Sequence, residues 1–575
     1  MRVIFTFTVI LLFFSLRISA QNWSTWGSNN QRNGLSELTG PDSVTTPFWT
    51  ASSANSLWGN SVYSFNDRFV TARVTFTPAY TATVECRKLI DGSLLWIKQV
   101  YSTSIMYPVG FTEDAVYVND YSSDSLYALS PEDGSVKWAV HYYTFGGNSG
   151  LVYACNRDPI IFGKRLNKET GETVWSYNYI VPVGPSAGYA AYNNTYYHWH
   201  GSITTDKKLF ALDTETGQFK YESAALPGDG DQEFPLTIGA DGTIYICRDG
   251  GHLYAFEDTG SGLNIKWEYV PDDPAGVRGN FGSNNEGNIY IIDNGVVKKL
   301  HKDTGSVLNF SSPIVSGFFP TISVDAAGKV FINNSLDAQG KFYCFSSDLQ
   351  TLHWELASPN ATYCGTSLNK DGIMLLFGSG NQINAYKKSG DFKPVSDFRA
   401  GQTKIFMGDS VDFFDQSSYE PTEWNWQFPG SLTPASTEQN PQNIVYTSKG
   451  IYDITLVSIN SFGTDTLTRT CYVEVLFVVD AEQENNFGRE FVLYQNYPNP
   501  FNPSTKISWQ SLVSGWQTLK IYDMLGNEIA TLVNEDKPPG IYEVEFIPEN
   551  LSSGIYLYKL YSGGFVQTKK MILLR

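Results

Sequence analysis

A pattern that recurs about every 43 residues is the strongest constraint on the fold of this 575-residue chain. Each copy runs from a short apolar strand, through a turn rich in Asp, Thr and Gly, to a second strand that ends in an aromatic residue. LYALSPEDGSVKW and LFALDTETGQFKY are two examples. The closing aromatic residues are Trp96, Trp138, Trp175, Tyr221, Trp267, Phe310 and Trp354. A period of this length indicates that each copy is one small β-sheet of a repeat protein.

A second set of turns has the same period. Gly242, Gly287, Gly328 and Gly372 each lie in a short polar turn between two strands, and successive glycines are 45, 41 and 44 residues apart. Glycine adopts the positive φ that such hairpins require. Because one small sheet cannot bury both of its faces, the sheets should pack around a common axis, each closing aromatic residue against the next sheet. The two patterns together predict a β-propeller.

The ends of the repeat predict how the ring closes. The last copy, INAYKKSG (383–390), has no closing aromatic residue, whereas Trp49 lies 47 residues before Trp96 with no complete copy ahead of it. We therefore expect the strand that carries Trp49 to complete the last blade. This gives an eight-bladed propeller over residues 22–392, with a seven-bladed ring as the alternative.

The repeat resembles that of the pyrroloquinoline-quinone (PQQ) type of propeller, which occurs in quinoprotein alcohol dehydrogenases and in a non-enzymatic lipoprotein scaffold of outer-membrane assembly. The resemblance covers about 370 residues and implies the fold. The dehydrogenases hold their cofactor against a disulfide between adjacent cysteines, and no two of the six cysteines here are adjacent. We therefore expect no PQQ and no other organic cofactor, whereas a structural Ca²⁺ could be present.

The pattern changes after the repeat. Residues 395–477 read as alternating strands separated by turn signals, and Tyr452, Ile454 and Leu456 should share one face of a strand. The segment resembles a PKD domain, an Ig-like sandwich, in its EWNWQF, NP and KGIYDITLVSIN motifs. PKD modules act as spacers or bind extended polymers, and we favour a spacer.

An acidic linker, residues 478–490, precedes a C-terminal region of short strands at 491–575, so the whole chain is expected to be all-β, with two sandwiches after the propeller. This region resembles the C-terminal sorting domain of type IX secretion substrates. That resemblance implies contact with the type IX machinery, passage across the outer membrane, and release or attachment at the surface. The residues that carry it are Tyr497, Pro498, Asn499, Pro500, Gly526, Gly554, Tyr556, Lys569 and Lys570.

The N-terminus predicts entry into the secretory route. Residues 1–20 contain Arg2 followed by an apolar run, about 15 residues long, that is typical of a signal peptide. We expect cleavage between Ala20 and Gln21. No comparable apolar stretch follows, so no transmembrane helix is expected in the mature chain. The expected location is secreted, or on the outer surface of a Gram-negative-type bacterium.

Charge and cysteine usage exclude several classes of function. The chain has 40 Lys and Arg against 58 Asp and Glu, a formal net charge of −18, which argues against nucleic acid as a partner. The cysteines are not at C-x-x-C spacing, and most stand in apolar strand patterns, so we interpret them as buried thiols. They are Cys86, Cys155, Cys247, Cys344, Cys364 and Cys471.

Two clusters could hold a metal ion. Asp229, Asp231 and Glu233 alternate along one loop and could ligate Ca²⁺, although the pattern fits a solvated acidic loop better. His198 and His200 project to one face of a strand and could share a metal, although two surface histidines are the favoured interpretation. No fingerprint of a nucleophile, metalloprotease helix or phosphate-binding loop occurs, so no catalytic residue is assigned.

These features favour a non-catalytic binding, adhesion or scaffold protein whose propeller presents loops to an extracellular glycan or protein. The alternative is an extracellular enzyme, either a quinoprotein-like oxidoreductase or a polysaccharide-active propeller. The enzyme hypothesis expects acidic or metal-ligating side chains near the axis, and the binding hypothesis expects exposed aromatic side chains.

Overall fold

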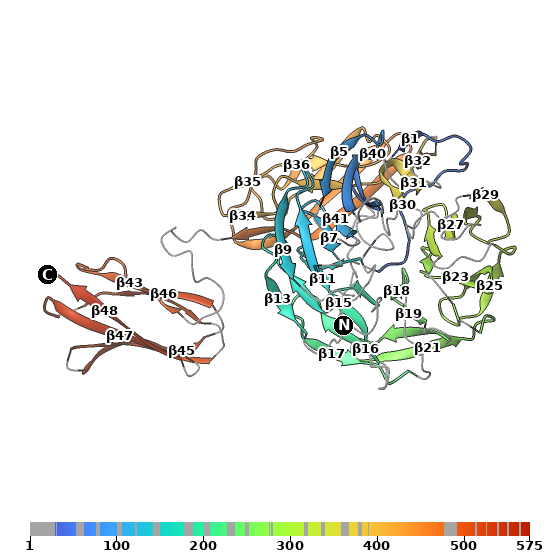
Figure 1. Ribbon diagram of the computed structural model, residues 1–575. Coiled ribbons are helices and arrows are strands. Elements are labelled where there is room, and N and C mark those ends of the chain that lie inside the picture. The colour runs from blue at the N-terminus through green and yellow to red at the C-terminus, as the bar shows by residue number, and fades with distance from the viewer. Residues whose placement is uncertain are drawn as a thin grey trace, which may run out of the picture. The chain divides into compact units, whose positions relative to one another are not determined.

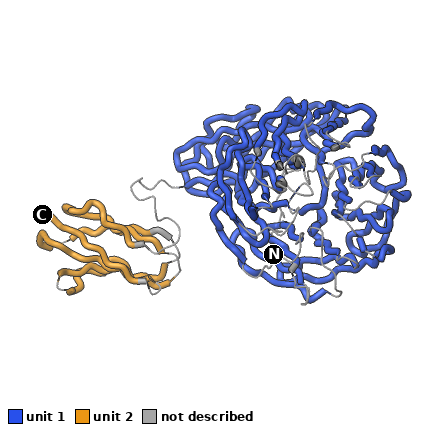
Figure 2. Tube along the Cα trace, viewed as in Figure 1, with its two compact units in different colours: residues 1–477 blue, residues 478–575 orange. Residues whose placement is uncertain are grey.

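The computed structural model describes residue 29 and residues 31–52, 62–75, 81–99, 106–120, 123–141, 150–177, 188–200, 208–226, 236–247, 252–274, 276–277, 280–314, 320–334, 340–357, 367–377, 382–388, 390–476, 492–511, 515–524, 526–537, 540–548, 551–562 and 565–574. The regular secondary-structure elements in these residues are β-strands, apart from one short 3-10 helix, η1 (Lys370–Gly372). They form two compact units, residues 1–477 and 478–575, shown in Figure 2. None of the described helices is long and apolar enough to cross a membrane. The all-β expectation is therefore confirmed.

The repeat region folds into four-stranded antiparallel sheets arranged in a ring (Figure 1). The described residues between 49 and 386 form eight such sheets. In sheet order their strands are β2 (Tyr63–Phe65), β3 (Arg68–Thr75), β4 (Thr81–Lys88), β5 (Leu94–Gln99); β6 (Met106–Phe111), β7 (Val116–Asp120), β8 (Ser125–Leu129), β9 (Val136–His141); β10 (Val152–Tyr153), β11 (Pro159–Ile161), β12 (Lys164–Leu166), β13 (Thr173–Ser176); β14 (Tyr189–Tyr192), β15 (Thr195–His200), β16 (Lys208–Asp213), β17 (Phe219–Glu222); β18 (Thr237–Ile238), β19 (Ile244–Cys247), β20 (Leu253–Asp258), β21 (Leu263–Tyr269); β22 (Gly282–Ser283), β23 (Ile289–Asp293), β24 (Val296–Leu300), β25 (Val307–Phe310); β26 (Thr321–Val324), β27 (Val330–Asn334), β28 (Lys341–Phe345), β29 (Leu352–Ala357); and β30 (Ser367–Asn369), β31 (Ile373–Phe377), β32 (Gln382–Tyr386), β1 (Trp49–Ser52).

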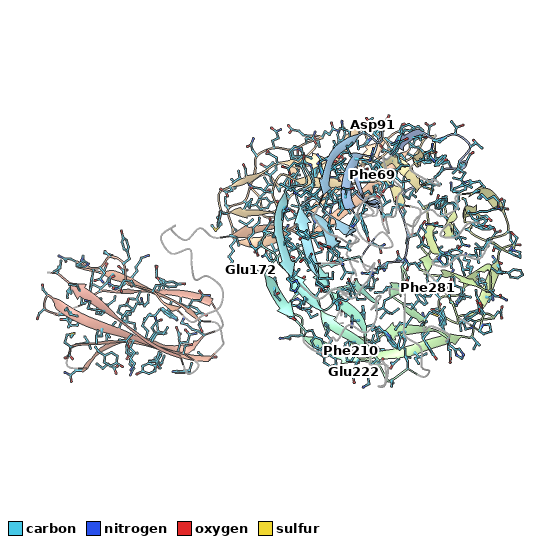
Figure 3. The ribbon with its side chains drawn as sticks, viewed as in Figure 1. Phe69, Asp91, Glu172, Phe210, Glu222 and Phe281 are labelled. Carbon is cyan, nitrogen blue, oxygen red and sulfur yellow. A yellow bond between two sulfur atoms is a disulfide. The ribbon has the colours of Figure 1, made fainter. Side chains whose placement is uncertain are left out.

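Burial changes from the first strand of each sheet to the last. First strands such as β18 and β26 are buried along their length, whereas last strands such as β9 and β29 expose most of their residues. Figure 1 shows the last strands on the outside of the ring. Figure 3 shows Glu172 and Glu222 at the outer edge and Phe281 further inside. The apolar cores therefore lie between neighbouring sheets, as in a propeller.

The recurring turn and the closing tryptophan meet between neighbouring sheets. Trp175 of β13 donates its indole hydrogen to the carbonyl of Thr214 in the next sheet, at 3.0 Å. Gly217, in the same turn, has φ +68°, and a Cβ built on it would lie 2.5 Å from the Trp175 ring. The turn therefore needs glycine both for its backbone and for the space that the indole takes. Trp96, Trp138 and Trp267 make the same contacts with the sheets that follow them.

The ring closes through the strand that carries Trp49. β1 pairs antiparallel with β32, with Trp49 opposite Ala385. The Trp49 indole donates to the carbonyl of Leu89 in the sheet of β2–β5, at 2.9 Å. The predicted contribution of Trp49 to the last sheet is confirmed.

The segment after the repeat forms a smaller β-structure, here called the middle sandwich (residues 395–476). It contains a five-stranded sheet and two strand pairs around a core that includes Trp426, Phe428 and Tyr446. Ile454 and Leu456 are buried and Tyr452 packs against them, so the shared face is confirmed. The strands are β33 (Phe398–Ala400), β34 (Lys404–Phe406), β35 (Ser410–Val411), β36 (Phe413–Asp415), β37 (Glu423–Gln427), β38 (Ala435–Ser436), β39 (Ile444–Val445), β40 (Gly450–Asn460) and β41 (Gly463–Leu476).

The second unit, here called the tail sandwich, has two sheets with the orders β42-β43-β46 and β45-β44-β47-β48. Its core contains Trp509, Tyr558 and Met571, all buried. It therefore has a hydrophobic core of its own. The strands are β42 (Val492–Leu493), β43 (Thr505–Ser511), β44 (Gly515–Tyr522), β45 (Glu528–Lys537), β46 (Gly540–Phe546), β47 (Gly554–Ser562) and β48 (Phe565–Leu573).

Candidate functional site

The chain before β1 crosses the first strands of three sheets. The backbone N–H of Ile238 in β18 donates to the carbonyl of Gln31, and the side-chain amide of Asn33 donates to the carbonyl of Ile238 at 3.0 Å. The N–H of Ser283 in β22 donates to the carbonyl of Asn33, and that of Val324 in β26 to the carbonyl of Gly34. Residues 31–34 thus satisfy backbone groups on inner strands that would otherwise lack a partner on that side.

Arg32 is a buried cation within this segment. Its guanidinium lies 4.4 Å from the centre of the Tyr189 ring, and its Nη2 donates to the carbonyl of Gly150. Its Nε and Nη1 have no hydrogen-bond partner, and no carboxylate of the described residues pairs with it. Burial raises the pKa of Tyr189 to about 12, against the opposing effect of the Arg32 charge. The Gly150 carbonyl and the Tyr189 ring therefore both compensate the buried charge.

The same segment then runs to the hairpin between β26 and β27. The Gly40 N–H donates to Oδ2 of Asp325 at 2.9 Å, and Lys329 donates to the Gly40 carbonyl and to Asp42. The indole of Trp354 donates to the carbonyl of Pro41 at 3.3 Å. The Trp354 indole therefore donates to a carbonyl of the N-terminal segment. The indoles of Trp96, Trp138, Trp175 and Trp267 instead donate to a carbonyl of the next sheet.

A disulfide joins the propeller to the middle sandwich. Cys155, between β10 and β11, is bonded to Cys471 of β41, 316 residues later, with 6.1 Å between their Cα atoms. The interpretation of these two cysteines as buried thiols is therefore wrong. The sequence offers no local signal for this pair, because its partners meet only when two domains dock.

Charged side chains surround this disulfide. Arg157 pairs with Glu113 and lies 4.7 Å from the centre of the Tyr472 ring, and the Tyr472 hydroxyl donates to Glu113 at 3.2 Å. Lys168 pairs with Asp114 at 2.9 Å. Burial alone would lower the pKa of Arg157, but Glu113 and Tyr472 raise it above its ordinary value. Burial would raise the pKa of Asp114, but the charges of Lys168 and Arg157 together lower it. The junction therefore holds paired charges rather than isolated ones.

A second set of contacts fixes the middle sandwich to the last sheet, which closes the ring. The Tyr419 N–H donates to Asp371 at 3.1 Å, and the Asp371 N–H donates to the Ser418 hydroxyl at 2.9 Å. The Tyr419 hydroxyl accepts from the N–H of Thr39 at 3.3 Å. The middle sandwich is thus bonded to the sheets β6–β9 and β10–β13, to the last sheet and to the N-terminal segment. A spacer role would therefore be that of a rigid spacer.

These contacts identify one end of the propeller. Glu113, Cys155 and Asp371 lie in hairpins between first and second strands, and Lys168 lies between a third and a fourth strand. In a four-stranded antiparallel sheet both kinds of hairpin lie at the same end of the strands. We call this the hairpin end, and the described contacts with the middle sandwich are all made there. The connections from one sheet to the next start from the opposite end, here called the connecting end.

The structure describes only part of the two clusters that could hold a metal ion. Asp229, Asp231 and Glu233 lie outside the described residues, as does the side chain of His200. His198 is 1% exposed and lies 6.1 Å from the ring of Tyr196, so its interpretation as a surface histidine is wrong. It faces the core between sheets because the inner strands are buried on both faces. The described residues contain no group of three potential metal ligands.

The other cysteines behave as small apolar side chains where they are described. Cys86, Cys247 and Cys344 are buried free thiols, as expected, and Cys364 lies outside the described residues. Burial raises the pKa of Cys86 to about 12 and also raises that of Cys344. Cys86 and Cys344 are therefore protonated at neutral pH.

The first sorting motif docks on the last strand of the chain. Asn499 accepts from the N–H of Ile572 at 2.8 Å, and Phe501 is buried, with its N–H donating to the carbonyl of Ile572. Tyr497 is 81% exposed, and the Tyr497–Pro498 and Asn499–Pro500 peptide bonds are cis. The two ends of the sorting region, about 70 residues apart in sequence, therefore form one structural element.

The remaining predicted sorting residues occupy strands and one turn. Gly526 has φ +86° in the turn between β44 and β45, and Gly554 begins β47. Tyr556 is buried and donates to the carbonyl of Ser552 at 2.9 Å, whereas Lys569 and Lys570 lie on β48 and are at least partly exposed.

Sequence reasoning missed Asn496, which is buried. Its amide nitrogen donates to the Thr505 hydroxyl at 2.9 Å and to the carbonyl of Pro498 at 3.1 Å, and its own backbone N–H donates to the Tyr558 hydroxyl. Asn496 lies one residue before the YPNPFNPST motif, so its place in the sequence could have identified it.

Comparison with protein families identifies the domain at the C-terminal end of the chain. Residues 495–574 match the secretion system C-terminal sorting domain. Proteins with this domain are secreted by the type IX system to the cell surface or the extracellular space. The expected location outside the cell is therefore confirmed, and so is the sorting role of the tail. A comparison with curated proteins found no match.

Comparison with solved structures found distant propellers. BamB from Moraxella catarrhalis is 15% identical, with 53% of this chain and 98% of that chain covered and a TM-score of 0.35. Quinohemoprotein alcohol dehydrogenase from Comamonas testosteroni is 12% identical, with coverages of 80% and 82% and a TM-score of 0.32. The Dos1 propeller is 12% identical, with coverages of 60% and 97% and a TM-score of 0.41. Because these TM-scores are below 0.5, we draw no functional argument from them.

Proposed function

We propose that this exported protein is a non-catalytic binding protein, and that the connecting end of its propeller recognises an extracellular polysaccharide. The observation that carries the proposal is the placement of the middle sandwich. Its disulfide and its contacts through Glu113, Lys168 and Asp371 are all at the hairpin end. We therefore propose the connecting end as the end that a ligand approaches.

The sequence of the connecting end supports a sugar ligand. Aromatic rings stack on the apolar faces of sugar rings, and rigid aromatic side chains are the anchors of many binding surfaces. Eight connections link the sheets, and each contains at least one aromatic residue. In the connection 270–281 this residue is Phe281, which is buried. The other seven connections contain, among others, Trp58, Tyr101, Tyr143, Tyr179, Phe234, Phe318 and Tyr363.

The overall charge narrows the class of polysaccharide. A chain with a net charge of −18 repels polyanions at low ionic strength, so the proposal favours neutral polymers. Binding through aromatic stacking should depend little on salt, because the contact is apolar.

The experiment is co-sedimentation of the secreted protein with insoluble cellulose, chitin and xylan, together with a glycan array. The test variant combines Trp58→Ala with Tyr143→Ala. The matched control is Phe310→Ala, because Phe310 is 62% exposed but lies on the outer strand β25. We expect at least one neutral polysaccharide to bind, with at least tenfold weaker binding by the test variant and unchanged binding by the control. Absence of any glycan binding, or equal loss in both variants, would contradict the proposal.

A further inference from the structure

The two sheets of the tail sandwich have outer faces of different chemistry. In the sheet β45-β44-β47-β48, Leu519, Ile521, Tyr558 and Leu560 are buried in the core. Since side chains alternate along a strand, their neighbours project to the outer face. We call this outer face the aromatic face. Its large apolar residues are Trp516, Tyr522, Ile555, Leu557, Tyr561, Val566 and Ile572.

The aromatic face is exposed and continuous. Trp516 is 62% exposed, Val566 49%, Ile555 40% and Tyr561 37%. Tyr561 lies between Thr518 and Val566 in the strand register. In the next two rows of the register, Lys520 is opposite Lys559, which is opposite Thr568, and Tyr522 is opposite Leu557, which is opposite Lys570. The face therefore combines apolar rings with three lysines.

The side chains of this face are held in place. The Trp516 indole donates to the side-chain oxygen of Asn534 at 2.9 Å, and the Lys559 ammonium lies 4.8 Å from the centre of the Tyr561 ring. Lys520 donates to Glu528 at 2.8 Å. Exposed rings that are already ordered lose little conformational entropy when a partner covers them.

The other sheet, β42-β43-β46, provides an internal comparison. On its outer face Lys506 pairs with Glu543 at 2.7 Å, and Ser508 donates to the same carboxylate at 3.3 Å. Such polar side chains are typical of the solvent-exposed face of an antiparallel sheet. One small domain therefore has a polar outer face and an aromatic one, although solvation alone would favour polar residues on both.

We propose that the aromatic face is the surface by which the type IX export machinery binds the tail. Exposed Trp and Tyr are the residues most enriched at the energetic centres of protein interfaces. The face lies wholly within the segment that matches the sorting domain, whose role requires recognition by another protein. The complementary partner is a protein groove with an apolar floor and acidic residues opposite Lys559 and Lys570, because Lys520 is already paired with Glu528.

This inference rests on the sorting role of the tail and not on the ligand proposed for the propeller. Its test uses the full-length chain, and the readout is the fraction of protein found outside the cell. The test variant combines Trp516→Thr, Ile555→Thr and Val566→Thr, because threonine preserves strand propensity while removing apolar area. The matched control combines Lys506→Gln with Glu543→Gln on the polar face. Resistance of the purified tail to proteolysis reports folding of each variant.

We expect the test variant to remain folded and its export to fall at least tenfold, with accumulation inside the cell, while the control is exported within twofold of the unaltered protein. If the triple variant proves sensitive to protease, Lys559→Glu takes its place, since it changes charge at a partly exposed position without removing core contacts. Normal export of a folded aromatic-face variant would overturn the proposal. So would an equal loss in the control, or a change in the thermal stability of residues 1–477, because the latter would mean that the face packs on the protein's own first unit.

Discussion

Trp175 and Gly217 pack against each other across the boundary between two sheets, and their contact explains the spacing of the repeat. The indole lies where a Cβ of residue 217 would stand, 2.5 Å from the nearest ring atom. In this pair, the turn of one sheet leaves a gap for the tryptophan of the sheet before it. The same pairing joins Trp96 to Gly134, and Trp267 to Gly305.

Gly217→Ala should destabilise the first unit by about 2–4 kcal/mol, since a positive φ and an overlap with a packed ring add together. Gly260→Ala is the matched control. Gly260 has φ +79° but nothing within 4 Å of its Cβ position, so it should cost only about 1 kcal/mol. Urea unfolding followed by fluorescence would measure both, and equal losses would show that the indole contact is unimportant.

The disulfide should be detectable and stabilising. A non-reduced proteolytic digest of the secreted protein should contain one peptide pair linking Cys155 to Cys471. The variant Cys155→Ser with Cys471→Ser should lose about 2–5 kcal/mol of stability, because the bond joins segments far apart in the unfolded chain. Mass spectrometry that finds both thiols free in the secreted protein would contradict this junction.

Acid should weaken the ion pair of Asp114 with Lys168, the lysine that also donates to Thr403 of the middle sandwich. The pKa of Asp114 is lower in the folded protein than in the unfolded chain, so its pairing with Lys168 stabilises the fold above about pH 4. That stability is lost as the pH falls through the folded-state pKa. Thermal melts between pH 2 and 7 should show a smaller loss in acid for Asp114→Asn than for the unaltered protein. Identical pH profiles would refute a role for Asp114.

Arg32 should contribute little to stability, although it is buried. Its Nε and Nη1 have no hydrogen-bond partner, so an apolar side chain of similar length avoids a desolvation cost. Arg32→Met should change the free energy of unfolding by less than about 1 kcal/mol, or increase it. Asn33→Ala is the contrasting variant: it removes a buried hydrogen bond to the carbonyl of Ile238 and should cost about 1–3 kcal/mol. A large loss in Arg32→Met would indicate an acidic partner.

The local pattern predicted much of the fold, because the interactions that it encodes repeat at fixed spacing. Trp49 could be assigned to the last sheet since every other sheet had its own closing residue. The N-terminal segment could not be placed, because residues 31–42 carry no repeat and their contacts with Ile238 and Asp325 are far away in sequence. The bond between Cys155 and Cys471 was missed for the same reason.

The tail was predicted from its motifs, but its aromatic face was not. Alternation puts Tyr556 and Tyr558 on one side of β47, but a single strand does not say which side faces the core. Only the packing of both sheets around Trp509 shows that Trp516 and Tyr561 are left outside.

Hydrogen–deuterium exchange of the secreted protein, with and without the neutral polysaccharide that it retains, tests the central claim most directly. The account predicts slower exchange in the connections 53–61, 142–149 and 178–187, with no change in the hairpin turns around Asp91, Asp133 and Asp241. Protection of those turns, without protection of the connections, would contradict a ligand at the connecting end.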